Sequence, residues 1–122
     1  NVRGMHGDAL VFLDRLPATS LAGIRVFFPD PWPKARHHHR RLVRDDVVER
    51  LVGLLRPGGF LHLATDIEDY ALQMRSVCDR RTELTGGPIE RPAERPVTRY
   101  EQKGIDVGHA VVDLWYARSH YR

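Results

Sequence analysis

A carboxylate, an indole and a run of cations stand close together in the segment from Phe27 to Arg41. In Pro29-Asp30-Pro31-Trp32-Pro33, three prolines restrict the backbone around one acidic and one aromatic side chain. The basic residues that follow are Lys34, Arg36, His37, His38, His39, Arg40 and Arg41. Arginine binds phosphate through two parallel hydrogen bonds, and aromatic side chains stack on exposed bases. The pattern predicts a site that handles one base of a nucleic acid.

Asp30 is the strongest candidate for a direct role in chemistry. It lies between two prolines, so it cannot join a β-ladder, and the turn itself needs no carboxylate. Asp8 and Asp66 also follow predicted strands, and parallel strands would bring all three carboxylates to one edge of a sheet. Open α/β sheets bind their ligands along that edge. Helix capping is an alternative role for Asp8 and Asp66.

Other polar features leave alternatives open. Trp32 is expected either to stack on a base or to pack on the domain. The basic residues 34–41 are expected to contact backbone phosphates, and the alternative is a solvated arm. Adjacent histidines point in divergent directions and no further cysteine or spaced histidine completes a zinc pattern, so we predict no metal. The polar run Thr98, Arg99, Tyr100 and Glu101 fits a binding loop or a solvated turn equally well.

Hydrophobic periodicity predicts the elements that position these residues. Strands are expected at 2–6, 23–28, 60–64, 82–85 and 110–117, with a loop at 86–96. Helices are expected at 9–16, at 43–55 and from a capping box at Thr65–Glu68 to about residue 80. Strands that alternate with helices predict a doubly wound, mostly parallel α/β sheet with helices on both faces. The last two strands lack an intervening helix and are expected to pair antiparallel.

The composition is that of one globular domain with its own core. The chain has 122 residues, a hydrophobic fraction of 42% and a net charge of +3, and 17 of its 19 cations are arginine. It has no apolar run near the roughly 20 residues that span a bilayer, so no membrane role is expected. Residues 1–8 lack the pattern of a signal peptide. A lone cysteine, Cys78, predicts a buried, inert thiol and a reducing compartment such as the cytoplasm.

The chain begins in or just before a predicted strand, and no Gly-x-Gly loop follows any strand. Doubly wound folds normally begin with such a β-α unit and bind a nucleotide-like ligand there. We therefore expect residues 1–122 to form the C-terminal part of a single larger domain, without its cofactor-binding N-terminal half. By itself, this part is expected to bind a cofactor poorly and to be inactive.

The Pro-framed turn (residues 29–33) and the basic arm (residues 34–41) together carry a family resemblance. Phe28–Lys34, followed by Arg36-His37 and Arg40-Arg41-Leu42, resembles the signature of bacterial tRNA (guanine-N7-)-methyltransferases. Further motifs agree in the family's order over residues 1–116: Gly7-Asp8-Ala9, Gly58-Gly59, Ala64-Thr65-Asp66 with Tyr70, Arg95–Glu101 with Gly104, and Gly108-His109 before Asp113-Leu114.

The resemblance implies a class I, Rossmann-like fold that uses S-adenosylmethionine and no metal to methylate N7 of a variable-loop guanosine in tRNA. It implies that Asp8 lies near the cofactor's adenine and that Asp30 is the catalytic aspartate, also close to the methyl donor. It assigns contacts with the substrate to Lys34, Asp66 and Thr98–Glu101, and contacts with RNA to Arg36–Arg41.

Two alternatives belong to other classes. Amino-methyltransferases of adenine or cytosine carry a related Asp/Asn-Pro-Pro-aromatic turn, but here Trp32 follows the first proline directly. A non-enzymatic RNA-binding module would also explain the basic arm in a chain without a cofactor loop.

Overall fold

The computed structural model describes residues 16–92 and 110–120. Asp8, Thr98–Glu101, the predicted strand 2–6 and nearly all of the predicted helix 9–16 lie outside these ranges. The described strands are β1 (Leu21–Phe27), β2 (Leu55–Thr65), β3 (Leu84–Ile89) and β4 (Val112–Arg118). The described helices are the 3₁₀-helix η1 (Ala35–Arg40) and the α-helices α2 (Asp45–Leu54) and α3 (Glu68–Asp79).

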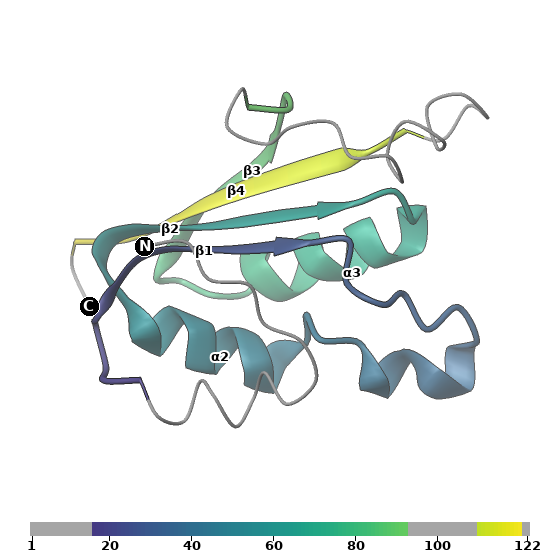
Figure 1. The fold of residues 1–122 in the computed structure, drawn as a ribbon, viewed down its shortest axis with the longest axis horizontal. Coiled ribbons are helices and arrows are strands. Elements are labelled where there is room, and N and C mark those ends of the chain that lie inside the picture. The colour runs from purple at the N-terminus through teal and green to yellow at the C-terminus, as the bar shows by residue number, and fades with distance from the viewer. Residues whose placement is uncertain (1–15, 93–109, 121–122) are drawn as a thin grey trace.

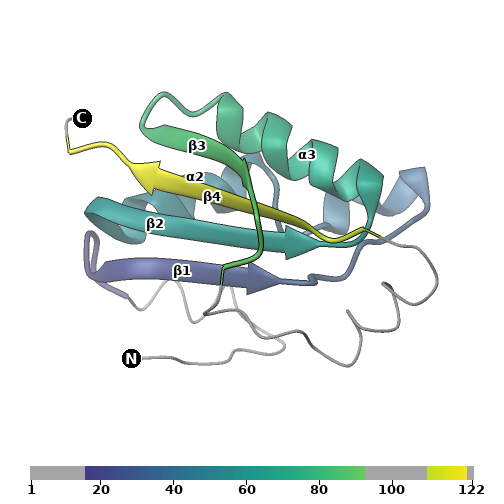
Figure 2. The same cartoon turned by 90° about the horizontal axis from the view of Figure 1, so that it is seen from above.

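The described strands form one mixed sheet with the order β1-β2-β4-β3, which Figure 2 shows from above. β1 and β2 run parallel, whereas β4 pairs antiparallel with both β2 and β3. The expected antiparallel pairing of the last two strands is therefore confirmed. The described part of the sheet is nevertheless mixed, not mostly parallel, because β4 inserts between β2 and β3. Both described α-helices cover the same face of it (Figure 1).

The core lies between the sheet and these two helices. Leu61 and Leu63 of β2 are fully buried, and α3 contributes Tyr70, Met74 and Cys78. Every apolar position predicted for the second helix is buried: Val43, Val47, Val48, Leu51, Leu54 and Leu55. The 3.6-residue period thus identified the buried face of α2 correctly.

The ends of several elements differ from the predictions. β2 begins at Leu55, five residues before the predicted strand 60–64, and α2 ends at Leu54. α3 begins at Glu68 after the N-cap residue Ile67, and the Thr65 hydroxyl accepts a hydrogen bond from the Ile67 N–H at 3.2 Å. The predicted capping box therefore does not form, and Asp66 is not the N-cap. β3 extends to Ile89, through residues 86–89 that were expected in a loop. Pro88 is tolerated there because β3 is an edge strand of the described sheet.

Within residues 16–92 and 110–120, none of the helices is long and apolar enough to cross a membrane. Cys78 is fully buried on α3, which confirms the predicted buried thiol.

Cys78 should resist alkylation until the protein unfolds. Burial, aided by the negative charge of Asp79, raises the pKa of the thiol from 9.0 to about 12, so the folded protein holds almost no thiolate at pH 8. Iodoacetamide labelling can be followed by mass spectrometry of the tryptic peptide 76–80, with and without denaturant. Between pH 9 and about 12 only the unfolded chain loses this proton, so stability should fall as the pH rises. Equal labelling rates in both states would contradict the burial.

Candidate active site

The candidate site lies where the parallel strands β1 and β2 end. Phe27 of β1 is paired beside Ala64 of β2, so both carboxyl ends meet at one edge of the sheet, at the right of Figure 1. Asp30 follows β1 and is exposed, whereas Asp66 follows β2 directly and is half-buried. The structure thus brings these two predicted carboxylates to one edge, where α/β sheets bind ligands.

The turn that carries Asp30 has an unusual backbone at both of its ends. Phe28 and Trp32 adopt φ angles of 51° and 42°, in the left-handed region that bulky side chains rarely enter. Such strain costs on the order of 1–3 kcal/mol per residue and persists only when surrounding contacts hold it. The Phe28 N–H donates to the Ala64 carbonyl at 2.8 Å, and the Trp32 N–H donates to Asp30 Oδ1 at 3.2 Å.

Trp32 is half-buried and lies against η1. The Arg40 guanidinium carbon is 5.0 Å from the centre of the indole ring, and the His37 ring meets the indole edge-on at 5.8 Å between ring centres. The described residues therefore place a cation over one face of the indole. Of the two predicted roles, packing on the domain is realised through η1.

The basic arm forms the 3₁₀-helix η1, which begins after Lys34. The Lys34 carbonyl accepts a hydrogen bond from the His37 N–H at 2.8 Å, and Pro33 immediately precedes this turn. The side chains of His37 and His38 are half-buried, whereas those of Lys34, Arg36, His39 and Arg40 are exposed. Four basic side chains thus lie at the surface within seven residues of sequence.

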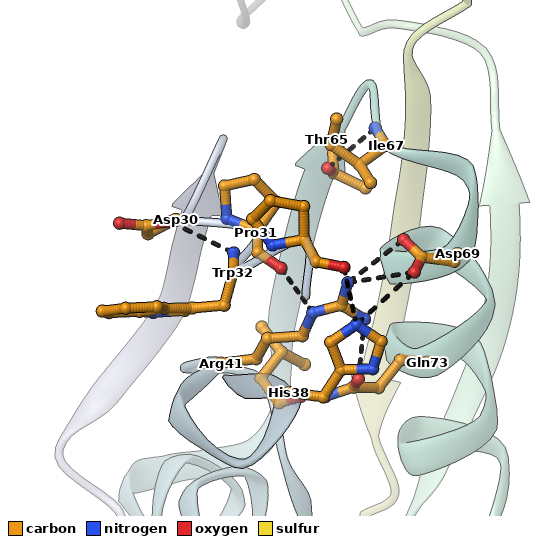
Figure 3. A network of polar contacts seen from close by, with 11 residues as sticks. Asp30, Pro31, Trp32, His38, Arg41, Thr65, Ile67, Asp69 and Gln73 are labelled. Atoms are coloured by element: carbon orange, nitrogen blue, oxygen red, sulfur yellow. Dashed lines mark hydrogen bonds and ion pairs between the residues drawn. The ribbon is translucent and has the colours of Figure 1, made fainter. Parts of the chain in front are cut away.

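Arg41 lies elsewhere, and the structure gives its guanidinium protein partners where a contact with RNA phosphate was expected. Its side chain is only 1% exposed and its guanidinium lies 4.7 Å from the centre of the Tyr70 ring. Nε donates to the Pro31 carbonyl at 2.6 Å, and the two terminal nitrogens donate to Gln73 Oε1 and to both oxygens of Asp69 at 3.0–3.1 Å (Figure 3). The guanidinium is therefore enclosed by protein groups and lies apart from the exposed basic side chains of residues 34–40.

Tyr70 contributes to this enclosure from α3. Its side chain is fully buried and its hydroxyl accepts a hydrogen bond from the Val43 N–H at 3.0 Å. Burial raises the pKa of the phenol above its ordinary value, so Tyr70 stays neutral beneath the guanidinium.

Sequence reasoning missed a second buried polar pair. His62 Nε2 lies 2.8 Å from Asp113 Oδ1, and the two side chains are only 1% and 3% exposed. The Phe27 ring packs against the imidazole at 4.8 Å between ring centres. An imidazole inside the apolar strand run 60–64 was the available signal, because a buried ionisable group needs a partner. The partner, Asp113, lies on β4 and could not be inferred from spacing.

Sequence reasoning gave no role to Asp69 and Gln73. They lie four residues apart on α3, and this spacing was the signal for a shared partner. For metals, no suitable group of three His, Cys, Asp or Glu side chains occurs within residues 16–92 and 110–120.

The described sheet and helices have the Rossmann-like fold that is found in methyltransferases. The family model described as "Putative methyltransferase" matches residues 1–114, and the chain belongs to this family. A protein of Thermus thermophilus, described as a "putative DNA modification methylase", has the same fold, with a TM-score of 0.60 at 19% identity. That match covers 93% of this chain and 50% of the other. The predicted class I methyltransferase fold is confirmed.

The relatives also confirm the resemblance noted from the motifs. A tRNA (guanine-N(7)-)-methyltransferase of Streptomyces avermitilis is 48% identical over 97% of this chain and 43% of its own length. An enzyme of the same name from Thiobacillus denitrificans is 49% identical over 97% of this chain and 54% of its own length. The chain therefore spans about half the length of the relatives that it matches.

Removing the carboxylate of Asp113 should destabilise the protein. Asp113→Ala leaves the buried His62 imidazole without this partner, and an unsatisfied buried group costs about 1–3 kcal/mol. Asp46→Ala is the matched control, because Asp46 is 69% exposed and pairs with Arg44 at the surface, where such pairs contribute at most about 1 kcal/mol. The free energy of unfolding in urea measures both. Equal losses in the two variants would show that the buried pair contributes nothing special.

Proposed function

We propose that the protein to which this chain belongs transfers a methyl group from S-adenosylmethionine to N7 of a guanosine in the variable loop of tRNA. One observation carries the proposal: an exposed carboxylate at the ligand-binding edge of the sheet is joined, through Trp32 and η1, to an exposed cationic surface. The names of the relatives, at 48–49% identity over nearly the whole chain, support the same activity.

The described residues fit a methyl donor that carries positive charge. Asp30 presents its carboxylate at the shared end of β1 and β2, and the bond from the Trp32 N–H fixes one of its oxygens. When bound, S-adenosylmethionine supplies an electrophilic methyl group on a positively charged sulfur. We propose that Asp30 lies beside that charge and that Asp8 lies near the adenine, as the family resemblance implies.

The chemistry requires placement and electrostatics more than proton transfer. Guanine N7 has a free lone pair, so it needs no base before it attacks a methyl group in line. Holding two reactants in that geometry accounts for a large part of the rate enhancement of such a step. Methylation leaves positive charge on the purine, and a fixed carboxylate stabilises charge that develops in the transition state. Asp30 is therefore assigned orientation and charge stabilisation.

Recognition of tRNA is divided between the edge of the sheet and the arm. Lys34 and Asp66 are proposed to contact the target nucleotide together with Thr98, Arg99, Tyr100 and Glu101. Arg36, His37, His38, His39 and Arg40 are proposed to contact the RNA backbone, and Arg41 is withdrawn from this group. A cytoplasmic location, where tRNA is available, belongs to the same proposal.

Replacing Asp30 should remove most of the methyl transfer. With labelled S-adenosylmethionine and unmodified tRNA, the full-length protein should form 7-methylguanosine, and Asp30→Asn should lower the rate on the order of 100-fold because a fixed charge is lost. Asp46→Asn, at an exposed position of α2, is the control and should keep the rate. Nucleoside chromatography identifies the product. Label on adenine would overturn the proposed substrate, and an unchanged rate in Asp30→Asn would overturn the role of Asp30.

Removing cations of the arm should weaken tRNA binding and its dependence on salt. Arg36→Ala and Arg40→Ala should each lower the slope of log K against log salt by about one, as expected for a lost phosphate contact. Arg80→Ala is the control. Arg80 is exposed, follows the C-terminal end of α3 and pairs with Asp45. Binding of S-adenosylmethionine alone should not change. A slope identical to that of the unmodified protein would remove the arm from the RNA interface.

A further inference from the structure

We propose that Arg41 is a positioning residue that holds the Asp30 turn, residues 29–33, against α3 and thereby fixes the Asp30 carboxylate. The proposal builds on the proposed methyl transfer, because it concerns how that reaction's carboxylate is held. It replaces the phosphate contact that the sequence suggested for Arg41. It also gives a role to Asp69 and Gln73, which the proposed chemistry does not use.

The central observation is that Arg41 and Asp30 bind opposite sides of one peptide group. The Pro31 carbonyl accepts from Arg41 Nε at 2.6 Å, and the N–H of the same peptide, that of Trp32, donates to Asp30 Oδ1 at 3.2 Å (Figure 3). A peptide group is planar and rigid, so a tilt at its carbonyl is also a tilt at its N–H. Hydrogen bonds on both sides of an amide also strengthen one another. The position of the guanidinium is therefore transmitted to the carboxylate.

The guanidinium is itself held from α3. Asp69 accepts from one terminal nitrogen through both carboxylate oxygens at 3.1 Å, and Gln73 Oε1 accepts from the other at 3.0 Å. Gln73 is oriented in turn, because its amide nitrogen donates to the Val43 carbonyl at 2.9 Å. The Tyr70 ring lies against the cation at 4.7 Å. Only a planar group with several fixed donors can satisfy the turn and both α3 side chains together, and lysine cannot.

Neighbouring arginines therefore have separate tasks. Arg40 is exposed, lies over Trp32 and belongs to the proposed RNA surface. Arg41 is buried and contacts the other side of the turn through a backbone carbonyl. The geometry predicts that the two residues affect different kinetic constants: Arg40 the KM for tRNA, and Arg41 the turnover at saturating tRNA.

Arg41→Lys in the full-length protein tests this assignment. We expect kcat to fall about 10- to 100-fold, since a small displacement of a catalytic group has effects of that size. The KM for tRNA and the salt slope of binding should stay within about twofold, whereas Arg40→Ala should show the reverse pattern. Arg75→Lys makes the same exchange at a position of α3 that is 55% exposed, and it should change neither constant.

The position of the Asp30 turn can also be followed by ¹⁹F NMR, which does not depend on enzymatic activity. Protein labelled with 5-fluorotryptophan gives a ¹⁹F resonance for Trp32, which Trp32→Phe assigns. Arg41→Lys should shift or broaden that resonance, and Arg75→Lys should not. If the unmodified protein forms no 7-methylguanosine, the proposed function fails, while this resonance still decides whether Arg41 holds the turn.

If Arg41→Lys does not fold, Asp69→Asn tests the same proposal, because Asp69 accepts two hydrogen bonds from Arg41. Asp69 is 54% exposed, so its replacement is tolerated, and loss of its charge should lower kcat about 3- to 10-fold and move the Trp32 resonance. The double variant should be little worse than Arg41→Lys alone, because both changes break one link. An unchanged kcat and an unchanged Trp32 resonance in the variants that fold would overturn the proposal. So would a raised KM with a flattened salt slope and a normal kcat in Arg41→Lys, which would make Arg41 a phosphate contact.

Discussion

The arrangement of the site depends on the hydrogen bonds that the buried guanidinium of Arg41 makes. A charge that is 1% exposed must be paired and hydrogen-bonded, or the protein pays a large desolvation penalty. Its partners come from the turn after β1 and from α3, segments about forty residues apart in sequence. One side chain therefore links the turn after β1 to α3. The strained φ angles of Phe28 and Trp32 are held within this frame.

The sequence predicted the features that depend on local pattern. The apolar period of residues 43–55 located the buried face of α2, and the apolar run before Pro29 located β1. From these, parallel pairing alone was enough to expect Asp30 and Asp66 at one edge of the sheet. The Pro-framed turn and the basic arm then identified the family, because their order is specific.

The features that were missed depend on partners distant in sequence. Arg41 directly follows several exposed basic residues in the sequence. Its contacts with Asp69, Tyr70 and Gln73 of α3 distinguish it from Arg40. His62 likewise required Asp113 of β4, which lies 51 residues further along the sequence. Local preference also lost to packing at Thr65–Glu68, where a capping box was favoured but the helix begins later. Pairing along an edge strand similarly extended β3 through Gly86, Gly87 and Pro88.

The hydrogen bond from Arg41 to a main-chain oxygen has a consequence for which substitutions this site tolerates. A carbonyl is present whatever side chain occupies position 31, so this link does not depend on that side chain and persists when neighbouring residues change. The exposed cations of residues 34–40 contribute nothing to that link. Under the proposed function, substitutions of Lys34, Arg36 or His39 alter the surface proposed to meet RNA and leave this link in place, whereas Arg40 also contacts the turn through Trp32. The proposed RNA surface and the proposed link that holds the carboxylate are thus formed by different side chains, although both are encoded within a dozen consecutive residues.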